Sequence, residues 1–230
     1  MKNIFSLDSK LMQGLSTVGD YIILNVLFLI TSLPIVTIGA AKVALYRVMF
    51  DMLEDRGNTY KRYFKTFAAE FKIATPLWLL QLIALAFVFA ELYIVANISS
   101  LPFLRAILVG LLILFLLIGS LFSNVPAQIA LFASTRREYL KNALYILITK
   151  FPRCFAVGFL NLFPALLALF NFGYWAVLGP LWLLLYYSVT TNLGARLFRG
   201  PFSEYLAAFE EKRSAPPEEP AENGDAPESP

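Results

Sequence analysis

The chain has 230 residues, of which 58% are hydrophobic, 15% aromatic and only 15% charged, with a net charge of +3. A water-soluble core of this size does not need so many apolar side chains, so the composition excludes an ordinary soluble domain and predicts helices that face lipid. The sequence contains no histidine and one cysteine. These counts exclude histidine-based acid–base catalysis, histidine metal ligands and a disulfide bond within the chain.

Five segments are long and apolar enough to cross a bilayer, which takes about 20 residues of α-helix. Pro34 is expected to end the first crossing and Pro126 to follow the third, and turn residues at 171–173 separate the last two. The sequence therefore predicts an all-α, polytopic membrane helix bundle as one domain over residues 1–213. The predicted crossings are 20–38, 73–97, 103–124, 154–171 and 174–195.

The basic residues predict which way round the protein sits in the membrane. Sixteen of the 19 Lys and Arg residues fall in the segments that follow the first, third and fifth predicted crossings. Short loops rich in Lys and Arg stay on the cytoplasmic side, so the pattern predicts an N-terminus outside and a C-terminus in the cytoplasm. Anionic lipid of the cytoplasmic leaflet is a sufficient partner for these charges, and no nucleic acid is required.

The cytoplasmic connectors are predicted to form amphipathic helices along the membrane surface. An apolar stripe over 45–53 lies opposite Arg47 and Asp51, and a second helix over 60–72 combines aromatic and basic side chains. Residues 137–151 repeat this pattern. Basic amphipathic helices beside a membrane crossing lie in the headgroup plane, where they meet lipid or a partner protein. The residues expected on this surface are Lys61, Arg62, Phe64, Lys65, Phe67, Phe71, Lys72, Arg137 and Lys141.

Two sequence features bear on the ends of the chain. Residues 214–230 contain Pro, Glu and Ala but no large apolar side chain, so they predict a disordered cytoplasmic tail. Near the N-terminus, Asp8 and Asp20 offset Lys2 and Lys10. This weak basic region disfavours a cleaved signal peptide and favours a retained first crossing.

Two charged residues, Glu91 and Arg105, are predicted to lie within the membrane. They are at equal depth on neighbouring antiparallel crossings, where an ion pair is geometrically favoured. The pair either pins the two helices together, which we prefer, or belongs to a functional path. Other polar side chains in the crossings form hydrogen bonds between helices or, as the alternative, line a cavity for a sugar. These residues are Asp20, Asn25, Gln81, Asn124, Gln128, Asn161 and Asn192.

A distinctive motif follows the first predicted crossing. Its residues are Pro34, Thr37, Ile38, Gly39, Ala44, Leu45 and Tyr46, followed by the aromatic and basic stretch Tyr63-Phe64-Lys65-Thr66-Phe67 with Phe71-Lys72. The motif resembles the signature of the YesL-like family of bacterial membrane proteins, although Ala40 stands where that family usually has proline. In physical terms, Pro34 and Gly39 end the crossing and turn the chain along the membrane, and Thr37 caps the next helix.

The resemblance implies a setting and no chemical mechanism. Members of the YesL-like family often belong with carbohydrate uptake systems of Gram-positive bacteria, particularly ABC-type sugar importers. We therefore expect an accessory or scaffold component of the bacterial plasma membrane that contacts sugar-transporter subunits. The family supplies no catalytic or ligand-binding residues, and we expect no enzymatic activity and no cofactor. The alternative is a small permease with a polar path near Glu91, Arg105 and Asp20, and a membrane enzyme ranks third.

Overall fold

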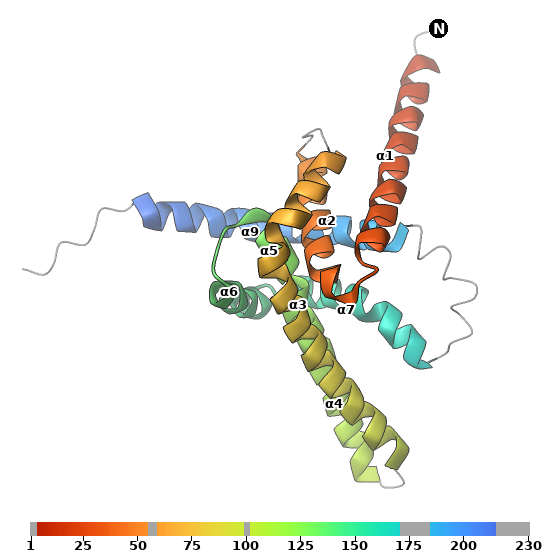
Figure 1. The fold of residues 1–230 in the computed structure, drawn as a ribbon, viewed down its shortest axis with the longest axis vertical. Helices are drawn as coiled ribbons and strands as arrows, with labels where there is room; N and C mark the ends of the chain where they lie inside the picture. Colours follow the sequence, from red (N-terminus) through yellow and green to blue (C-terminus); the bar gives the residue numbers. More distant parts are fainter. Residues whose placement is uncertain (1–3, 55–58, 99–101, 171–184, 215–230) are drawn as a thin grey trace, which may run out of the picture.

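The computed structural model describes residues 4–54, 59–98, 102–170 and 185–214, and nearly all of these residues are helical (Figure 1). No β-strand occurs in these ranges, so the predicted all-α class is confirmed for the part of the chain that the structure describes. The elements are α1 (Ile4–Thr31), the short 3₁₀ helix η1 (Ile35–Thr37), α2 (Ile38–Leu53), α3 (Thr59–Ile98), α4 (Pro102–Ser123), α5 (Val125–Leu131), α6 (Arg136–Thr149), α7 (Phe151–Phe170) and α9 (Tyr187–Ser214).

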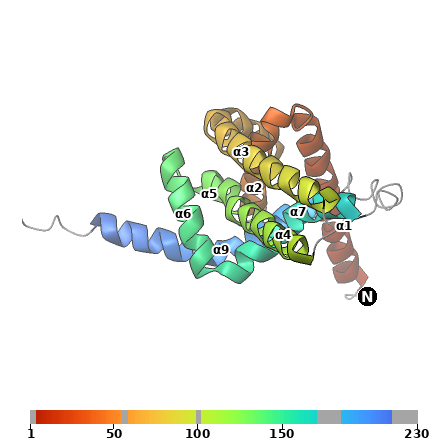
Figure 2. The ribbon, with the colours of Figure 1, turned by 90° about the horizontal axis from the view of Figure 1, so that it is seen from below.

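Helix α2 lies at the centre of the molecule, and α3, α5 and α9 pack around it (Figure 2). Its first half is rich in small residues, and Ala40, Ala41 and Ala44 have no exposed surface. Small side chains let neighbouring backbones approach closely, so one helix can be covered from several directions. On the expected polar face, Asp51 is only 4% exposed. The prediction that 45–53 lies along the membrane surface is therefore wrong, because this helix is buried among its neighbours.

Helix α3 runs without interruption for 40 residues. It contains both the predicted surface helix 60–72 and the predicted crossing 73–97, so the expected separate helix in the headgroup plane is not present. Pro76 lies inside α3 without ending it, and the neighbouring Leu77 is buried in the core that α3 shares with α2. Packing on α2 thus supports the helix across the proline. Helices α3 and α4 form a hairpin that projects from the rest of the molecule (Figure 1).

Two of the described helical segments, Tyr60–Val95 and Ile107–Leu131, are long and apolar enough to cross a membrane. A third crossing is added if the bent pair α6 and α7, which meet at 111°, counts as one. The five predicted crossings are therefore not confirmed. The apolar part of α1, Leu15–Thr31, is shorter than a full crossing. The predicted turn at 171–173 and the first half of the predicted crossing 174–195 lie outside the described residues.

The apolar part of α1 begins beside the start of α3. The Tyr60 hydroxyl donates a hydrogen bond of 2.6 Å to Asp20 Oδ1, and the hydroxyls of Thr31 and Tyr63 share a hydrogen bond of 2.7 Å. Helix α1 ends at Thr31, earlier than predicted, because the chain already turns ahead of Pro34. A crossing between Asp20 and Tyr60 would place them on opposite sides of the membrane, so their contact does not fit the predicted first crossing.

Helix α6 begins at a capping box and corresponds to the predicted amphipathic helix 137–151. Glu138 N donates to Thr135 Oγ1 at 3.4 Å, and Thr135 N donates to Glu138 Oε2 at 2.8 Å. These bonds satisfy backbone N–H groups that a helix start otherwise leaves unpaired. The side chains of Tyr139 and Ala143 are buried against the core, while Leu144 is half exposed.

Helix α9 continues past the predicted end of the fifth crossing at residue 195. Its residues Phe198 and Phe202 are fully buried, and the Phe202 ring lies edge-on to Phe132 at 5.5 Å between centroids. Because these aromatic side chains pack into the core, the helix is held in place beyond the apolar segment that the sequence indicated. The tail predicted at 214–230 lies outside the described residues, apart from Ser214 at the end of α9.

Candidate functional site

The turn between α1 and α2 closes one end of a pocket. The Thr37 hydroxyl donates to the carbonyl oxygens of Thr31 and Pro34, the latter at 2.7 Å. The prediction that Thr37 caps the next helix is therefore wrong, because its hydroxyl bonds backward to the turn and makes no capping bond to α2. Trp78 Nε1 donates to the Ile35 carbonyl at 2.8 Å and ties this turn to α3.

Gly39 lies in the first turn of α2 and faces α3, whereas the sequence predicted a role in the turn itself. A Cβ at this position would lie 2.6 Å from Trp78 Cβ and 2.8 Å from the Ala74 carbonyl oxygen. Such distances are shorter than van der Waals contact, so the close packing of α2 on α3 requires glycine here. Lys42 follows three residues later on the same side of α2, which brings it to Trp78.

A pocket of about 610 Å³ opens beside Lys42. Its walls come from the end of α1, the start of α2, and from α3, α4, α7 and α9. The Lys42 ammonium lies 4.9 Å from the centre of the Trp78 ring, within the range of a cation–π contact. No acidic side chain in the described residues pairs with Lys42. Burial lowers the pKa of Lys42 to about 8, because the charged form has lost water without gaining a carboxylate.

Further polar groups line the pocket near Lys42. The Gln81 side chain is 8% exposed and makes no hydrogen bond within the described residues. Ser32 Oγ is buried and also has no hydrogen-bond partner there. Asn161 reaches the pocket from α7 and donates to the Val157 carbonyl at 2.8 Å. The remaining wall is mainly apolar and includes Leu82, Leu85, Phe89, Phe115 and Leu162.

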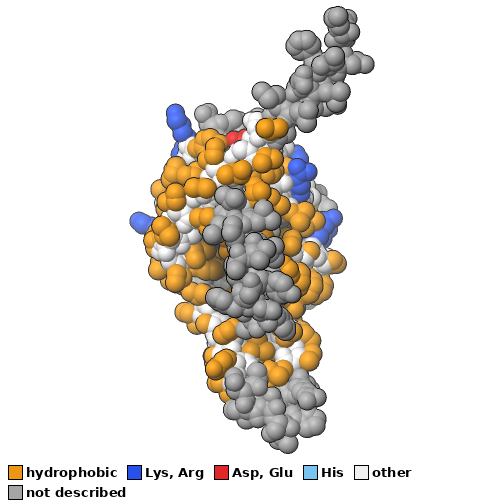
Figure 3. All heavy atoms as spheres, turned by 90° about the vertical axis from the view of Figure 1, so that its right-hand side faces the viewer, with side chains coloured by type: hydrophobic (Ala, Val, Ile, Leu, Met, Phe, Trp, Pro, Cys, Tyr) orange, Lys and Arg blue, Asp and Glu red, His pale blue; other side chains and the backbone are white. Residues whose placement is uncertain are grey.

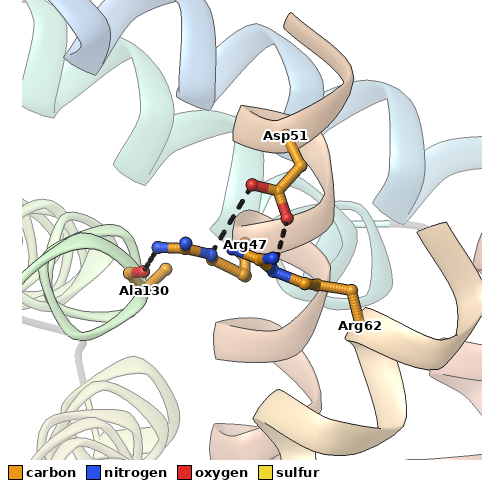
Figure 4. Close-up of polar contacts among 4 residues, drawn as sticks. All are labelled: Arg47, Asp51, Arg62 and Ala130. Atoms are coloured by element: carbon orange, nitrogen blue, oxygen red, sulfur yellow. Dashed lines mark hydrogen bonds and ion pairs between the residues drawn. The ribbon is translucent and has the colours of Figure 1, made fainter. Parts of the chain in front are cut away.

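A second polar cluster links α2, α3 and α5 (Figure 4). Arg62 Nε lies 2.9 Å from one carboxylate oxygen of Asp51, and Arg47 Nε lies 3.7 Å from the other. Arg47 Nη1 also donates to the Ala130 carbonyl at 2.8 Å. Because Asp51 is buried and bridges two arginines, this cluster holds three helices together. Arg62, predicted as part of the cytoplasmic lipid- or partner-binding surface, pairs with Asp51, while its side chain is still 41% exposed.

The predicted basic surface is distributed over the starts of α3 and α6. Phe67 and Phe71 are partly buried and pack on the core and on each other, with ring centroids 6.1 Å apart. The Arg136 guanidinium donates to the Lys72 carbonyl at 2.9 Å, so the two helices meet at this point. Binding of lipid or a partner by this surface stays a prediction. The members with exposed side chains are Lys61, Phe64, Lys65, Lys72, Arg137 and Lys141.

Basic and apolar surfaces are separated along the molecule. On the face seen in Figure 3, the Lys and Arg side chains lie in the upper part, and the described side chains of the α3–α4 hairpin below are mostly hydrophobic. Along α3, Lys61 and Lys65 are exposed near its start. Ile83 and Phe87 are each 67% exposed farther along the same helix. One continuous helix therefore carries a basic end and an apolar end.

The predicted intramembrane ion pair stays a prediction. Glu91 lies on α3 and is partly exposed. Arg105 falls in the first turn of α4, and its side chain lies outside the described part of the structure. The hairpin arrangement of α3 and α4 agrees with antiparallel neighbours, but no measured contact joins the two charges.

The other predicted intramembrane polar residues are spread over several sites. Asn25 Oδ1 accepts a hydrogen bond from Ser188 N at 3.0 Å and links α1 to α9. Gln128 donates to Asn124 Oδ1 at 2.5 Å at the start of α5. Asn192 contacts the Met49 sulfur at 3.7 Å. The contacts of Asn25 and Asn192 join different helices, as expected for polar side chains that hold helices together, whereas the bond between Gln128 and Asn124 lies within one helix end. Of this group, only Gln81 and Asn161 line the pocket.

Lys42 was not predicted as a site residue. The sequence counted it among the basic residues after the first crossing, as part of an orientation signal. A usable signal was present, because this lysine is flanked by Gly39, Ala40, Ala41, Val43 and Ala44 and therefore sits in a segment suited to tight helix packing. The described residues contain no group of three or more His, Cys, Asp or Glu side chains that could hold a metal ion.

Residues 21–92 match the model of a family described as "Protein of unknown function, DUF624". The matched segment is consistent with the motif noted in the sequence, and it includes Lys42, Trp78, Gln81 and the Asp51–Arg62 ion pair. It covers less than half of the chain, and its description assigns no activity. Neither the curated proteins nor the solved structures contain a match to this chain.

Proposed function

We propose that this chain is a YesL-like integral protein of the bacterial plasma membrane, which serves as an accessory or scaffold component of an ABC-type carbohydrate uptake system and catalyses no reaction. The observation that supports this proposal is the division of α3 into an exposed basic end and an exposed apolar end. Such a helix anchors in the bilayer through its apolar part and presents its basic end to cytoplasmic headgroups and to proteins docked there. The carbohydrate partner rests on the family resemblance.

The proposed orientation places the basic starts of α3 and α6 in the cytoplasm, together with the C-terminus. The α3–α4 hairpin then enters the bilayer from the cytoplasmic side. The external N-terminus predicted from the sequence is not kept in this proposal, because Asp20 of α1 is hydrogen-bonded to Tyr60 at the basic end of α3. Both ends of the chain therefore belong on the cytoplasmic side.

Affinity purification in a mild detergent, followed by mass spectrometry, tests the partner. We expect subunits of a sugar importer to copurify with the intact chain. Reversing three exposed charges together, Lys65→Glu, Lys72→Glu and Arg137→Glu, should lower their recovery about tenfold, because the docking surface changes sign. The matched control is Arg199→Glu, which reverses an exposed charge on α9 and should leave recovery unchanged.

Two results would contradict the proposal. One is a chain that reproducibly purifies without importer subunits. The other is transport of a labelled sugar by the purified protein alone in liposomes, which would favour the alternative of a small permease. If importer subunits still copurify with the triple variant, the accessory role stands. The assignment of the docking surface to α3 and α6 is then overturned.

A further inference from the structure

We propose that the Lys42 pocket binds one membrane phospholipid with an anionic headgroup, with the headgroup at Lys42 and an acyl chain along the apolar wall. This inference rests on the membrane location proposed above and is independent of the carbohydrate partner. It assigns a ligand to a built cavity, which is distinct from the general attraction of basic surface residues to anionic lipid.

The polar end of the pocket fits an anionic headgroup. Lys42 supplies a positive charge that no acidic side chain of the described residues neutralises. Gln81, which has no hydrogen-bond partner in that part of the chain, adds an amide that can donate to phosphate or ester oxygens. Buried polar groups normally have partners, so the unpaired Gln81 side chain in the same pocket as an unpaired cation indicates a missing polar ligand.

The apolar end fits an acyl chain. Along α3, the lining residues run from Trp78 and Gln81 to Leu85 and Phe89. At a rise of 1.5 Å per residue, Trp78 to Phe89 spans about 16 Å of helix, and the wall changes from polar to apolar along it. A free sugar would leave this apolar part of the pocket in contact with water, whereas an acyl chain covers it.

The direction of the pocket matches the direction of a lipid in the cytoplasmic leaflet. Lys72 is exposed on the basic end of α3, and Trp78 follows it by about 9 Å along the helix axis. The apolar wall continues from Trp78 toward the apolar end of α3. A lipid whose headgroup lies just inside the basic surface would therefore point its chain toward the centre of the bilayer. Anionic lipids are concentrated in the cytoplasmic leaflet, where the proposed orientation places this surface.

Quenching of Trp78 fluorescence by brominated lipid tests the proposal directly. The chain has three tryptophans, and Trp175→Phe with Trp182→Phe leaves Trp78 as the only emitter. This variant is reconstituted with dibromo-phosphatidylglycerol or dibromo-phosphatidylcholine diluted into unbrominated lipid. We expect the anionic lipid to reach half-maximal quenching at a mole fraction about tenfold lower, the ratio expected for one charge-assisted contact.

Matched variants separate the pocket from the general surface. Lys42→Met should remove the preference for the anionic lipid, and Lys65→Met, which deletes an exposed charge outside the pocket, should retain it. Ala86→Phe, which fills the apolar wall from an exposed position, should weaken quenching by both lipids. If Lys42→Met does not fold, Gln81→Leu replaces it and should reduce the preference.

Three results would overturn the proposal. They are equal quenching by the two lipids, a preference that survives Lys42→Met, and displacement of the lipid by millimolar inorganic phosphate, which would indicate a site for the phosphate group alone. None of these results depends on whether importer subunits copurify. The lipid site and the accessory role can therefore fail separately.

Discussion

Lys42 has an environment that is unusual for a lysine. It sits on a helix of small buried residues, and its ammonium faces an indole ring at 4.9 Å. Among the described residues that line the pocket, it is the only charged one. A partly buried cation without a counterion opposes folding unless a ligand or the ring stabilises it. The residue is therefore more easily explained by binding than by stability.

The contribution of Lys42 to the stability of the protein should rise with pH between about 8 and 10.5. Burial lowers the pKa of Lys42 from 10.5 to about 8. Between these values the unfolded chain holds a proton that the folded protein does not, so raising the pH favours the folded state. Below about pH 8, Lys42 is protonated in both the folded and the unfolded state, so it does not change the stability with pH. Thermal unfolding in detergent should therefore show that the difference in stability between the wild type and Lys42→Met grows across this range. Equal slopes in both proteins would contradict the assignment.

Replacing Asp51 by asparagine should destabilise the fold by about 2 kcal/mol, because it removes a buried charge that accepts from an arginine. The reason is the 2.9 Å contact with Arg62 and the 3.7 Å contact with Arg47. Chemical unfolding in detergent measures the loss. The control is Lys65→Gln, which removes an exposed charge from α3 and should change stability by less than about 0.5 kcal/mol. Similar losses for both variants would show that the burial of Asp51 has no energetic importance.

At the level of single residues, the sequence identified the important segment more readily than the roles within it. Gly39 and Thr37 were recognised as parts of one motif, but their contacts depend on α3, which lies far along the chain. The Thr37 side chain could have bonded either to the carbonyl oxygens of the turn or to the start of the next helix. In the structure it bonds to the turn carbonyls. The helical pattern predicts Asp51 to be a surface acid, and its arginine partners on α2 and α3 help to explain its burial.

Among the helices, the contact of α2 with α3 depends most on a single position. Gly39→Ala should cost about 1–3 kcal/mol, because the added methyl group meets the backbone of α3 and forces the helices apart. Gly110→Ala is the control, since a Cβ added at this position would have no neighbour within 4 Å, and it should be neutral or stabilising because alanine favours a helix. Chemical unfolding compares the two. A Gly39→Ala protein as stable as the control would contradict the close approach.

Sequence patterns predicted which segments are helical better than they predicted where helices end or join. The segment 137–151 and α6 agree closely because a capping box marks the start of this helix. The segment 60–72 was separated from 73–97 because its surface is polar, although the backbone of α3 continues through both. A change of environment along one helix looks, in sequence, like a boundary between two helices.

For the molecule as a whole, the sequence predicted an all-helical protein with apolar helices long enough to cross a membrane, but the five predicted crossings are not confirmed. Charge and hydropathy together favoured five crossings, because each apolar segment was treated as an independent span. In the structure, the chain turns back after α1, and α2 lies in the centre of the molecule. Because the chain turns back, the apolar part of α1 begins beside the start of α3. No local sequence pattern predicts this contact.

Cysteine labelling tests this arrangement. In a Cys154→Ser background, Ser16→Cys on α1 and Lys61→Cys on α3 introduce exposed thiols. Both should resist a membrane-impermeant maleimide in intact cells and react in inverted vesicles. The Asp20–Tyr60 hydrogen bond is the reason, because it holds these parts of the two helices on one side. Labelling of Ser16→Cys in intact cells would restore an external N-terminus.

The length of α3 has a mechanical consequence. Its 40 residues correspond to about 60 Å of continuous helix, roughly twice the thickness of the hydrocarbon core. A continuous helix of this length can couple movement at its basic end to movement at its apolar end. If a bound protein tilts α3 by about 5°, the far end of the helix moves by about 5 Å relative to the near end. Because α2 packs near the middle of α3 through Gly39, such a tilt would also change the width of the pocket beside Lys42.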